Sequence, residues 1–227
     1  MRLLITNIGI LAGLDKEQKL RLCGSEMKQF STIENAWLLI EDSRFKDWGK
    51  MSEMPSEGIP SDKTIDAGGG AVLPSWCDPH THIVFAGSRE GEFVDKICGL
   101  SYAEIAKRGG GILNSADLLH TFSEDELYSS AMRRVDEIIR KGTGCVEIKS
   151  GYGLNTEDEL KMLRVIRRIK ETAPLKVKST FLGAHAVGRG YSQPEYVDLV
   201  VNEMIPEVGK EHLADYVDVF CDEGFFT

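Results

Sequence analysis

The sequence lacks the marks of several large classes of protein. Its five cysteines form no Cys-x-x-Cys pair, and an odd count without a framework indicates reduced thiols in a cytoplasmic protein. No apolar run reaches the roughly 18–20 residues that a membrane span needs, so no membrane partner is expected. The apolar stretch at residues 1–11 is interrupted by Asn7, and no small-residue cleavage site follows it. This pattern indicates a strand rather than a signal peptide.

Nucleic-acid and phosphate-binding signatures are also missing. The net charge is −9, and the most basic stretch, residues 164–170, reads as the solvated face of an amphipathic helix. The glycines at 109–111 do not have the spacing of a phosphate-binding loop. What remains is an ordinary globular composition, 42% hydrophobic and 28% charged.

The pattern of the chain changes near residue 70. Residues 1–70 hold short alternating apolar stretches between turn-rich segments, which predicts a small β-rich domain. From residue 71 to residue 227 the order is strand, loop and helix, repeated, which predicts a parallel sheet with helices between its strands. The predicted strands are residues 71–77, 144–148, 176–182 and 216–221.

A recurring device marks the predicted helix starts. A hydroxyl residue stands three positions before a glutamate, which is the pattern of the capping box. The boxes begin at Ser101, Ser123, Thr156 and Ser192. After the third box, apolar residues recur at helical spacing over residues 160–169 and predict a face directed at the core.

His80 and His82 stand two positions apart at the end of the first predicted strand. Side chains two apart on a strand point the same way, so the two imidazoles are expected to converge as metal ligands. The alternative is a pair of polar residues in a turn. A catalytic site of this kind needs a third protein ligand, and within the chain His185 or Asp222 could supply it.

Three further polar residues are candidates for substrate binding: Arg89, seven residues past His82, and Tyr152 and His185, each just after a predicted strand. Arg89 suits a substrate carboxylate, although it could instead pair with a neighbouring glutamate. Tyr152 lies between glycines and His185 follows the third strand, and each could equally be a packed or hydrogen-bonded structural residue. Function at the carboxyl ends of strands is typical of a barrel, although an open doubly wound sheet places ligands there too. His120 and His212 follow no strand and are expected to be structural.

Four segments carry a resemblance to a known family. Residues 78–93 resemble the first strand of the amidohydrolase superfamily, and within it the imidazolonepropionases. The other segments, in matching order, are residues 146–154, 180–187 and 217–221. The resemblance implies an α/β (β/α)₈ TIM barrel and a cytoplasmic hydrolase of histidine degradation, with a homodimer as a possible assembly. Its small-molecule substrate would be 4-imidazolone-5-propanoate, and its product N-formimidoyl-L-glutamate.

The resemblance also implies roles for single residues. His80 and His82 would bind the metal ion, which would be zinc or iron. One ion is favoured, because the fourth predicted strand ends without a lysine to bridge two. Arg89 and Tyr152 would hold the propionate, and His185 the ring or a developing oxyanion. A further histidine and aspartate, and the acid and base residues, would lie beyond Thr227.

The predicted strands are too few for a whole barrel. Four strands follow residue 71, whereas a complete barrel has eight and takes ~250 residues. We therefore expect residues 71–227 to form the first half of a truncated barrel, which follows the small β-rich domain of residues 1–70 and is inactive by itself. Two alternatives stay open: another amidohydrolase, such as a heterocycle deaminase, or a non-catalytic half-barrel that acts as a binding module.

Overall fold

The computed structural model describes residues 1–15, 19, 21–101, 104, 111–222 and 226. The chain forms two compact units, residues 1–74 and 75–227, and each is described by itself. The division falls a few residues beyond the boundary expected at residue 70. None of the helices in the described part of the chain has the length and apolar character of a membrane span.

The first unit is built on a five-stranded sheet. Its strands are β1 (Arg2–Ala12), β2 (Thr32–Glu41), β3 (Arg44–Lys50), β4 (Lys63–Asp66) and β5 (Ala71–Val72). The order is β3-β2-β1-β4, and β5 also pairs with β1. Strands β1, β2 and β3 are antiparallel neighbours, whereas β4 and β5 run parallel to β1. Two short 3₁₀ helices, η1 (Gly24–Lys28) and η2 (Met51–Glu53), lie in its connections.

Local chemistry explains the hairpin in this sheet. Asp42 and Ser43 connect β2 to β3 with φ angles of 48° and 64°. Two positive φ angles in a two-residue loop give a twist that matches the strands on either side. Apolar residues of β1 and β2 are buried on both faces of the sheet, Ile8 and Leu38 in one cluster and Trp37 in another.

The second unit holds a four-stranded parallel sheet in sequential order, β6-β7-β8-β9. The strands are β6 (Trp76–Thr81), β7 (Thr143–Lys149), β8 (Lys176–Ala184) and β9 (Tyr216–Val219). The helices are α1 (Glu90–Ile97), α3 (Ile112–His120), α4 (Glu124–Arg140), α5 (Thr156–Thr172), α6 (Gln193–Leu199) and α7 (Ile205–Lys210), with a π-helical turn, η3 (Val200–Met204), between the last two. This is a mixed α/β unit with part of a barrel sheet.

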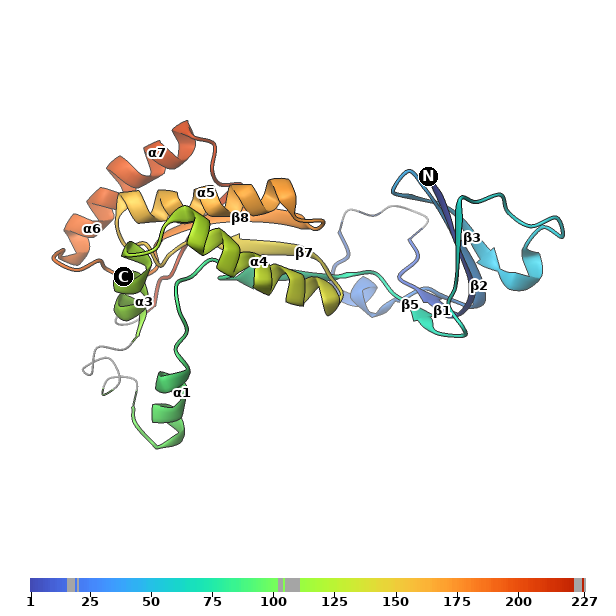
Figure 1. Ribbon diagram of the computed structural model, residues 1–227, viewed down its shortest axis with the longest axis horizontal. Coiled ribbons are helices and arrows are strands. Elements are labelled where there is room, and N and C mark those ends of the chain that lie inside the picture. The colour runs from blue at the N-terminus through green and yellow to red at the C-terminus, as the bar shows by residue number, and fades with distance from the viewer. Residues whose placement is uncertain (16–18, 20, 102–103, 105–110, 223–225, 227) are drawn as a thin grey trace. The chain divides into compact units, whose positions relative to one another are not determined.

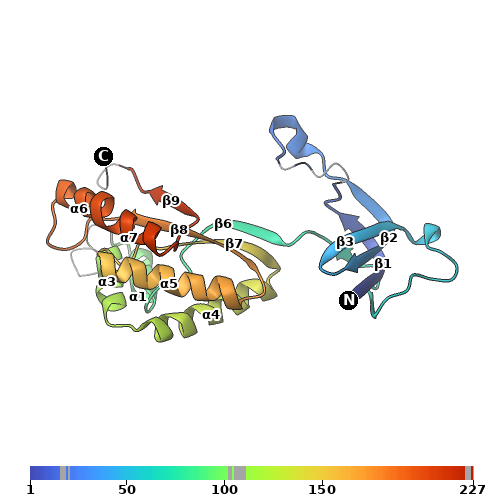
Figure 2. The ribbon, with the colours of Figure 1, turned by 90° about the horizontal axis from the view of Figure 1, so that it is seen from above.

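Helices α4 and α5 cover one face of this sheet. Figures 1 and 2 show them side by side along β7 and β8. The apolar stripe predicted over residues 160–169 is confirmed, because Leu163, Ile166 and Ile169 are fully buried in the main core. They pack there with apolar residues of both central strands, such as Val146 and Phe181. Apolar packing therefore stabilises the central strands of the second unit, and polar side chains lie at the carboxyl ends of these strands.

Two predictions about element boundaries are wrong. The strand expected over residues 71–77 is divided: Ala71 and Val72 pair with β1 in the first unit, and the second unit begins its sheet at Trp76. Pro74 lies in the break, and it has no N–H to offer a ladder.

The capping box expected at Thr156 is the second error. Thr156 is the first residue of α5, and Asn155 caps the helix by accepting a hydrogen bond from the Asp158 amide. Either side chain can cap a helix, so the pattern misplaced the start by one residue. The boxes at Ser123 and Ser192 are found as predicted. The two bonds of the box expected at Ser101 are also present: the Glu104 amide donates to the Ser101 hydroxyl at 3.3 Å, and the Ser101 amide donates to the Glu104 carboxylate at 2.8 Å. The neighbouring residues 102–103 and 105–110 lie outside the described chain.

Candidate active site

Polar rings gather where three parallel strands end. His80 is the penultimate residue of β6, and His82 follows that strand directly. Their ring centroids are 5.6 Å apart. The strand period places both side chains on one side of the sheet. The sequence predicted this pair as metal ligands, and the structure places the two rings next to each other at the strand end.

Tyr152 and His185 join His82 in one cluster. The rings of His82 and His185 stack with centroids 5.0 Å apart and an interplanar angle of 8°. Tyr152, in the loop after β7, lies 5.0 Å from the His82 ring and 5.4 Å from the His185 ring. Phe220, beyond β9, packs its edge against His185 at 6.0 Å. Residues far apart in the sequence thus meet at the carboxyl end of the sheet.

The two stacked imidazoles are uncharged at neutral pH. Burial, helped by unfavourable electrostatic interactions with His185, His80 and Lys149, lowers the pKa of His82 to about 4, against a backbone hydrogen bond with Ser150 that raises it. Burial also lowers the pKa of His185, against a backbone hydrogen bond that raises it. The Nδ1 atom of His82 is buried, and no described residue hydrogen-bonds to it. A buried imidazole nitrogen without a partner has a lone pair or proton to offer a ligand.

The tautomer of His185 follows from its partner. Its Nδ1 lies 2.9 Å from the carbonyl oxygen of Gly151. A carbonyl oxygen only accepts, so Nδ1 carries the proton and donates. The neutral ring then keeps a lone pair on Nε2, which makes that atom a hydrogen-bond acceptor.

Arg89 lies beside the same cluster. It is the residue before α1, and its Nη1 is 3.7 Å from Oε2 of Glu92. Arg89, Tyr152 and His185 line one cavity of about 430 Å³, together with Phe220 and residues of α1 and α3. Arg89 and Tyr152 also line a neighbouring cavity of about 270 Å³ that includes His82. The Arg89 guanidinium thus lines the same cavity as Tyr152 and His185, and it forms an ion pair with Glu92.

A buried ionic network was missed in the sequence. Lys149, at the end of β7, is only 5% exposed, and its Nζ donates to Glu147 at 2.6 Å and to Asp218 at 2.9 Å. The Thr180 hydroxyl donates to the same Glu147 carboxylate at 2.5 Å. Glu147 and Lys149 stand two apart in an otherwise apolar strand of a parallel sheet. That spacing was the available signal for an inward-facing charged pair.

A second missed residue is Glu159. The capping-box pattern placed it at a helix start, but its side chain is fully buried and accepts hydrogen bonds from the backbone of Gly151, Gly153 and Leu154. These residues form the loop that carries Tyr152. No pattern in the sequence distinguishes this inward glutamate from an exposed capping residue.

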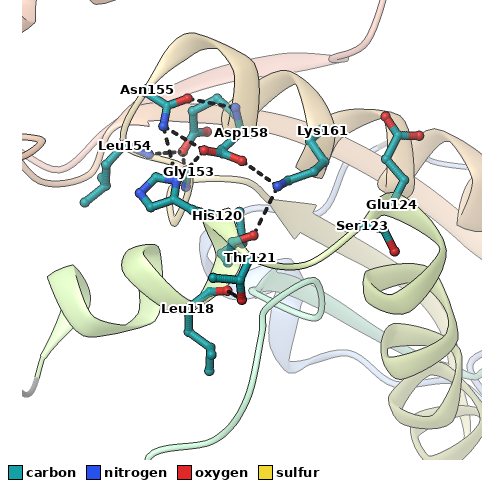
Figure 3. Close-up of polar contacts among 12 residues, drawn as sticks. Leu118, His120, Thr121, Ser123, Glu124, Gly153, Leu154, Asn155, Asp158 and Lys161 are labelled. Carbon is teal, nitrogen blue, oxygen red and sulfur yellow. Dashed lines mark hydrogen bonds and ion pairs between the residues drawn. The ribbon is translucent and has the colours of Figure 1, made fainter.

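His120 lies in a different network, at the junction of two helices. Figure 3 shows His120, at the end of α3, beside Asn155, which caps α5, and Asp158, on the first turn of α5. Its Nδ1 pairs with the Asp158 carboxylate, which also accepts from Asn155 at 2.7 Å and from Lys161 at 2.5 Å. This arrangement joins the two helix ends, in line with the structural role expected for His120.

A complete set of metal ligands is not found in the described part of the chain. Among the described residues, no group of three or more His, Cys, Asp or Glu side chains is placed to hold one metal ion. His185, one of the two residues considered for a third ligand, stacks on His82 and binds Gly151 through Nδ1. Asp222, the other, is exposed.

The curated proteins most similar to this chain in sequence include several that are named imidazolonepropionase. No family model matches the chain. It is 56% identical over 229 residues to an imidazolonepropionase of Christiangramia forsetii, covering 100% of this chain and 55% of that protein. It is 50% identical to the imidazolonepropionase of Flavobacterium johnsoniae, covering 99% of this chain and 54% of that protein. It is 40% identical to the imidazolonepropionase of Thermoanaerobacter pseudethanolicus, covering 90% of this chain and 49% of that protein. The chain thus spans about half the length of the curated relatives it matches.

Solved structures share the fold at low sequence identity. A triazine hydrolase variant aligns with a TM-score of 0.59 and 15% identity, covering 95% of this chain and 46% of that one. The guanine deaminase of E. coli aligns with a TM-score of 0.57 and 12% identity, covering 95% and 44%. These likenesses establish the fold, which is that of the amidohydrolases. With the sequence relatives, they show that the chain is a homologue of the imidazolonepropionases over about half of their length.

Proposed function

We propose that this chain forms part of the active site of a metal-dependent hydrolase that opens the ring of 4-imidazolone-5-propanoate to N-formimidoyl-L-glutamate. One observation carries the proposal. His82, Tyr152 and His185 converge to within 5.0–5.4 Å beside the cavity of Arg89, in a chain 56% identical to a protein named imidazolonepropionase. Because the chain spans about half of such a relative, the activity belongs to the completed protein.

The proposal includes a finer description of the fold. The parallel sheet β6-β7-β8-β9 would be the first half of a (β/α)₈ barrel, and the sheet of residues 1–74 a small β-rich domain before it. Apolar side chains on β9 support this, because Val217 and Val219 are 57% and 54% exposed. Further strands and helices of a closed barrel would cover such residues.

His80 and His82 are the residues that would hold the metal ion. Their adjacent rings and the partnerless, buried Nδ1 of His82 fit an imidazole pair that binds one ion. An atrazine chlorohydrolase of the same fold, TM-score 0.53 and 15% identity, was solved as a complex with zinc. Imidazole ligands suit zinc and iron alike. When bound, such an ion would supply an activated water at neutral pH.

The chain's own residues would bind and orient the substrate. The Arg89 guanidinium would exchange its ion pair with Glu92 for the propionate, which it can hold through two parallel hydrogen bonds. Tyr152 lies on the wall of the same cavity and would contact the substrate from there. His185, with its acceptor at Nε2, suits a ring N–H better than an oxyanion. The apolar wall at Phe220 would help exclude water from this side.

The test uses the completed protein, meaning this chain joined to the segment of the Christiangramia forsetii relative that it lacks. Supplied with zinc or iron, it should convert 4-imidazolone-5-propanoate to N-formimidoyl-L-glutamate, followed by product mass. Guanine and cytosine are tested in parallel. Deamination of either one without ring opening of the imidazolone would favour the heterocycle deaminase, and turnover of none would favour a non-catalytic module. The cytoplasmic location and the homodimer stay predictions.

A further inference from the structure

The carboxylate of Glu159 is an unusual feature of the loop that follows β7. It is fully buried on the first turn of α5, where an unpaired charge would be costly. Its Oε2 accepts from the Gly151 amide at 3.0 Å, and its Oε1 accepts from the amides of Gly153 at 2.7 Å and Leu154 at 3.2 Å. Burial raises the pKa of this carboxyl, while hydrogen bonds from Ser150 and the loop amides act against it. The side chain is thus committed to the loop backbone.

The loop needs this support because of its conformation. Gly151 has a φ of 110° and Leu154 a φ of 54°, and a leucine at positive φ is uncommon. A Cβ at Gly153 would lie 2.3 Å from the backbone nitrogen of Glu159, so the loop also passes unusually close to α5. A backbone held in sparsely populated conformations persists only where its surroundings determine it. Glu159 supplies three of those determining contacts.

Gly151 connects Glu159 to His185. Its N–H donates to Glu159, and its carbonyl oxygen accepts from Nδ1 of His185. The contact is close, because a Cβ at Gly151 would lie 2.8 Å from that Nδ1. A shift of this one residue would therefore move the partner that fixes the His185 tautomer. The next residue is Tyr152, whose ring packs against both histidines.

We propose that Glu159 is a positioning residue that holds the Gly151–Leu154 loop so that Tyr152 faces the cavity and His185 keeps its proton on Nδ1. Glu159 acts through the backbone and does not itself contact the substrate. The structural part of this inference stands on the hydrogen bonds alone. Its consequence for turnover rests on the proposed function.

The variant Glu159→Gln tests the inference, since glutamine keeps the size but turns one acceptor into a donor that faces a backbone N–H. In the completed protein with ¹⁵N-labelled histidine, the unsubstituted His185 should show a protonated Nδ1 and an unprotonated Nε2. The variant should show a mixture of tautomers, and kcat/KM should fall roughly 10–100-fold, the scale for displaced site groups. Glu157→Gln is the matched control: it removes an exposed carboxylate from the same helical turn and should leave both readouts unchanged.

The tautomer measurement needs no substrate, so it separates this inference from the proposed function. A completed protein without ring-opening activity would overturn the proposed function only. A folded Glu159→Gln variant whose His185 keeps the unsubstituted tautomer would overturn the role of Glu159. If that variant does not fold, hydrogen exchange of the unsubstituted protein decides. The Gly151 amide should then be protected as strongly as the amides of α5, and exchange at the rate of an open loop would contradict the inference.

Discussion

The imidazole of His82 lies parallel to that of His185, with an interplanar angle of 8° and 5.0 Å between ring centroids. The two residues follow β6 and β8, which are separated in the sheet by β7. Neighbouring strands lie ~4.8 Å apart, so strands two apart are separated by about twice that distance. The distance of 5.0 Å between the ring centroids is therefore about half of the separation expected between the two strands. Such convergence is expected of a sheet that curves into a barrel, and it lets separate strands share one site.

The first prediction concerns the carboxylate of the substrate. Changing Arg89 to alanine in the completed protein should reduce kcat/KM by the equivalent of about 2–5 kcal/mol, the scale for removing one partner of a desolvated charge pair. Steady-state kinetics with 4-imidazolone-5-propanoate measures the effect. Arg133→Ala, on the exposed side of α4, is the control and should be neutral. Undiminished turnover by the Arg89 variant would refute its assignment.

The second prediction concerns the metal ion. His82→Ala should lower the zinc or iron retained by the completed protein after dialysis by about tenfold or more, because it removes one of the two proposed imidazole ligands. Metal content by mass spectrometry checks this without an activity assay. His212→Asn is a suitable control, because asparagine tolerates the φ of 52° found at that position. Equal metal content in the His82 variant and the control would rule out His82 as a ligand.

The third prediction is a pH dependence of stability. Although burial raises the pKa of Asp215, hydrogen bonds from Lys170 and the Ser179 amide outweigh it and hold the pKa below its usual value. The unfolded chain therefore binds a proton more readily, so this contribution is present above about pH 3.8 and is lost as the pH falls below it. Asp215→Asn should cost about 1–3 kcal/mol of unfolding free energy at pH 7.

Urea unfolding of the completed protein at pH 7, 5 and 3 measures the contribution of Asp215. The difference in unfolding free energy between the unsubstituted protein and Asp215→Asn should be constant from pH 7 to 5 and smaller at pH 3. Asp136→Asn, an exposed position on α4, is the matched control. A difference that grows toward acid pH would mean that the sign of the shift is wrong.

The fourth prediction concerns the 227-residue chain by itself. Its described part brings together two proposed ligands, His80 and His82, where a catalytic metal site usually has three protein ligands. The sheet that carries them has four parallel strands. With zinc or iron added, the chain alone should give no detectable ring opening, and it should associate through the exposed apolar residues of β9. Turnover and light scattering are the measurements. Substantial turnover by a monomer would show that the site is complete within these residues.

Much of the fold was predictable from the sequence because its signals are local. Hydroxyl–glutamate spacings marked the starts of α4 and α6, and the apolar stripe of α5 gave its buried face. The division of residues 71–77 between two sheets was not predictable, since each fragment reads as strand and only tertiary pairing assigns it.

The site was only partly predictable for a similar reason. His82, Tyr152 and His185 each follow a strand, which the sequence reveals. The contacts among these three side chains depend on how the sheet curves, and the sequence does not reveal that curvature. Glu159 illustrates the limit. The sequence pattern assigned Thr156 as the helix cap and Glu159 as its capping partner, whereas Asn155 is the cap and the buried Glu159 side chain hydrogen-bonds to the loop that carries Tyr152.

The most direct test of the whole account is a crystal structure of the completed protein with N-formimidoyl-L-glutamate bound. We predict that a carboxylate of the product lies within hydrogen-bonding distance of both Arg89 and the Tyr152 hydroxyl. His185 should contact the formimidoyl end, and a metal ion should be bound by His80 and His82. A product bound elsewhere, with Arg89 still paired to Glu92 and the two histidines without metal, would contradict the account.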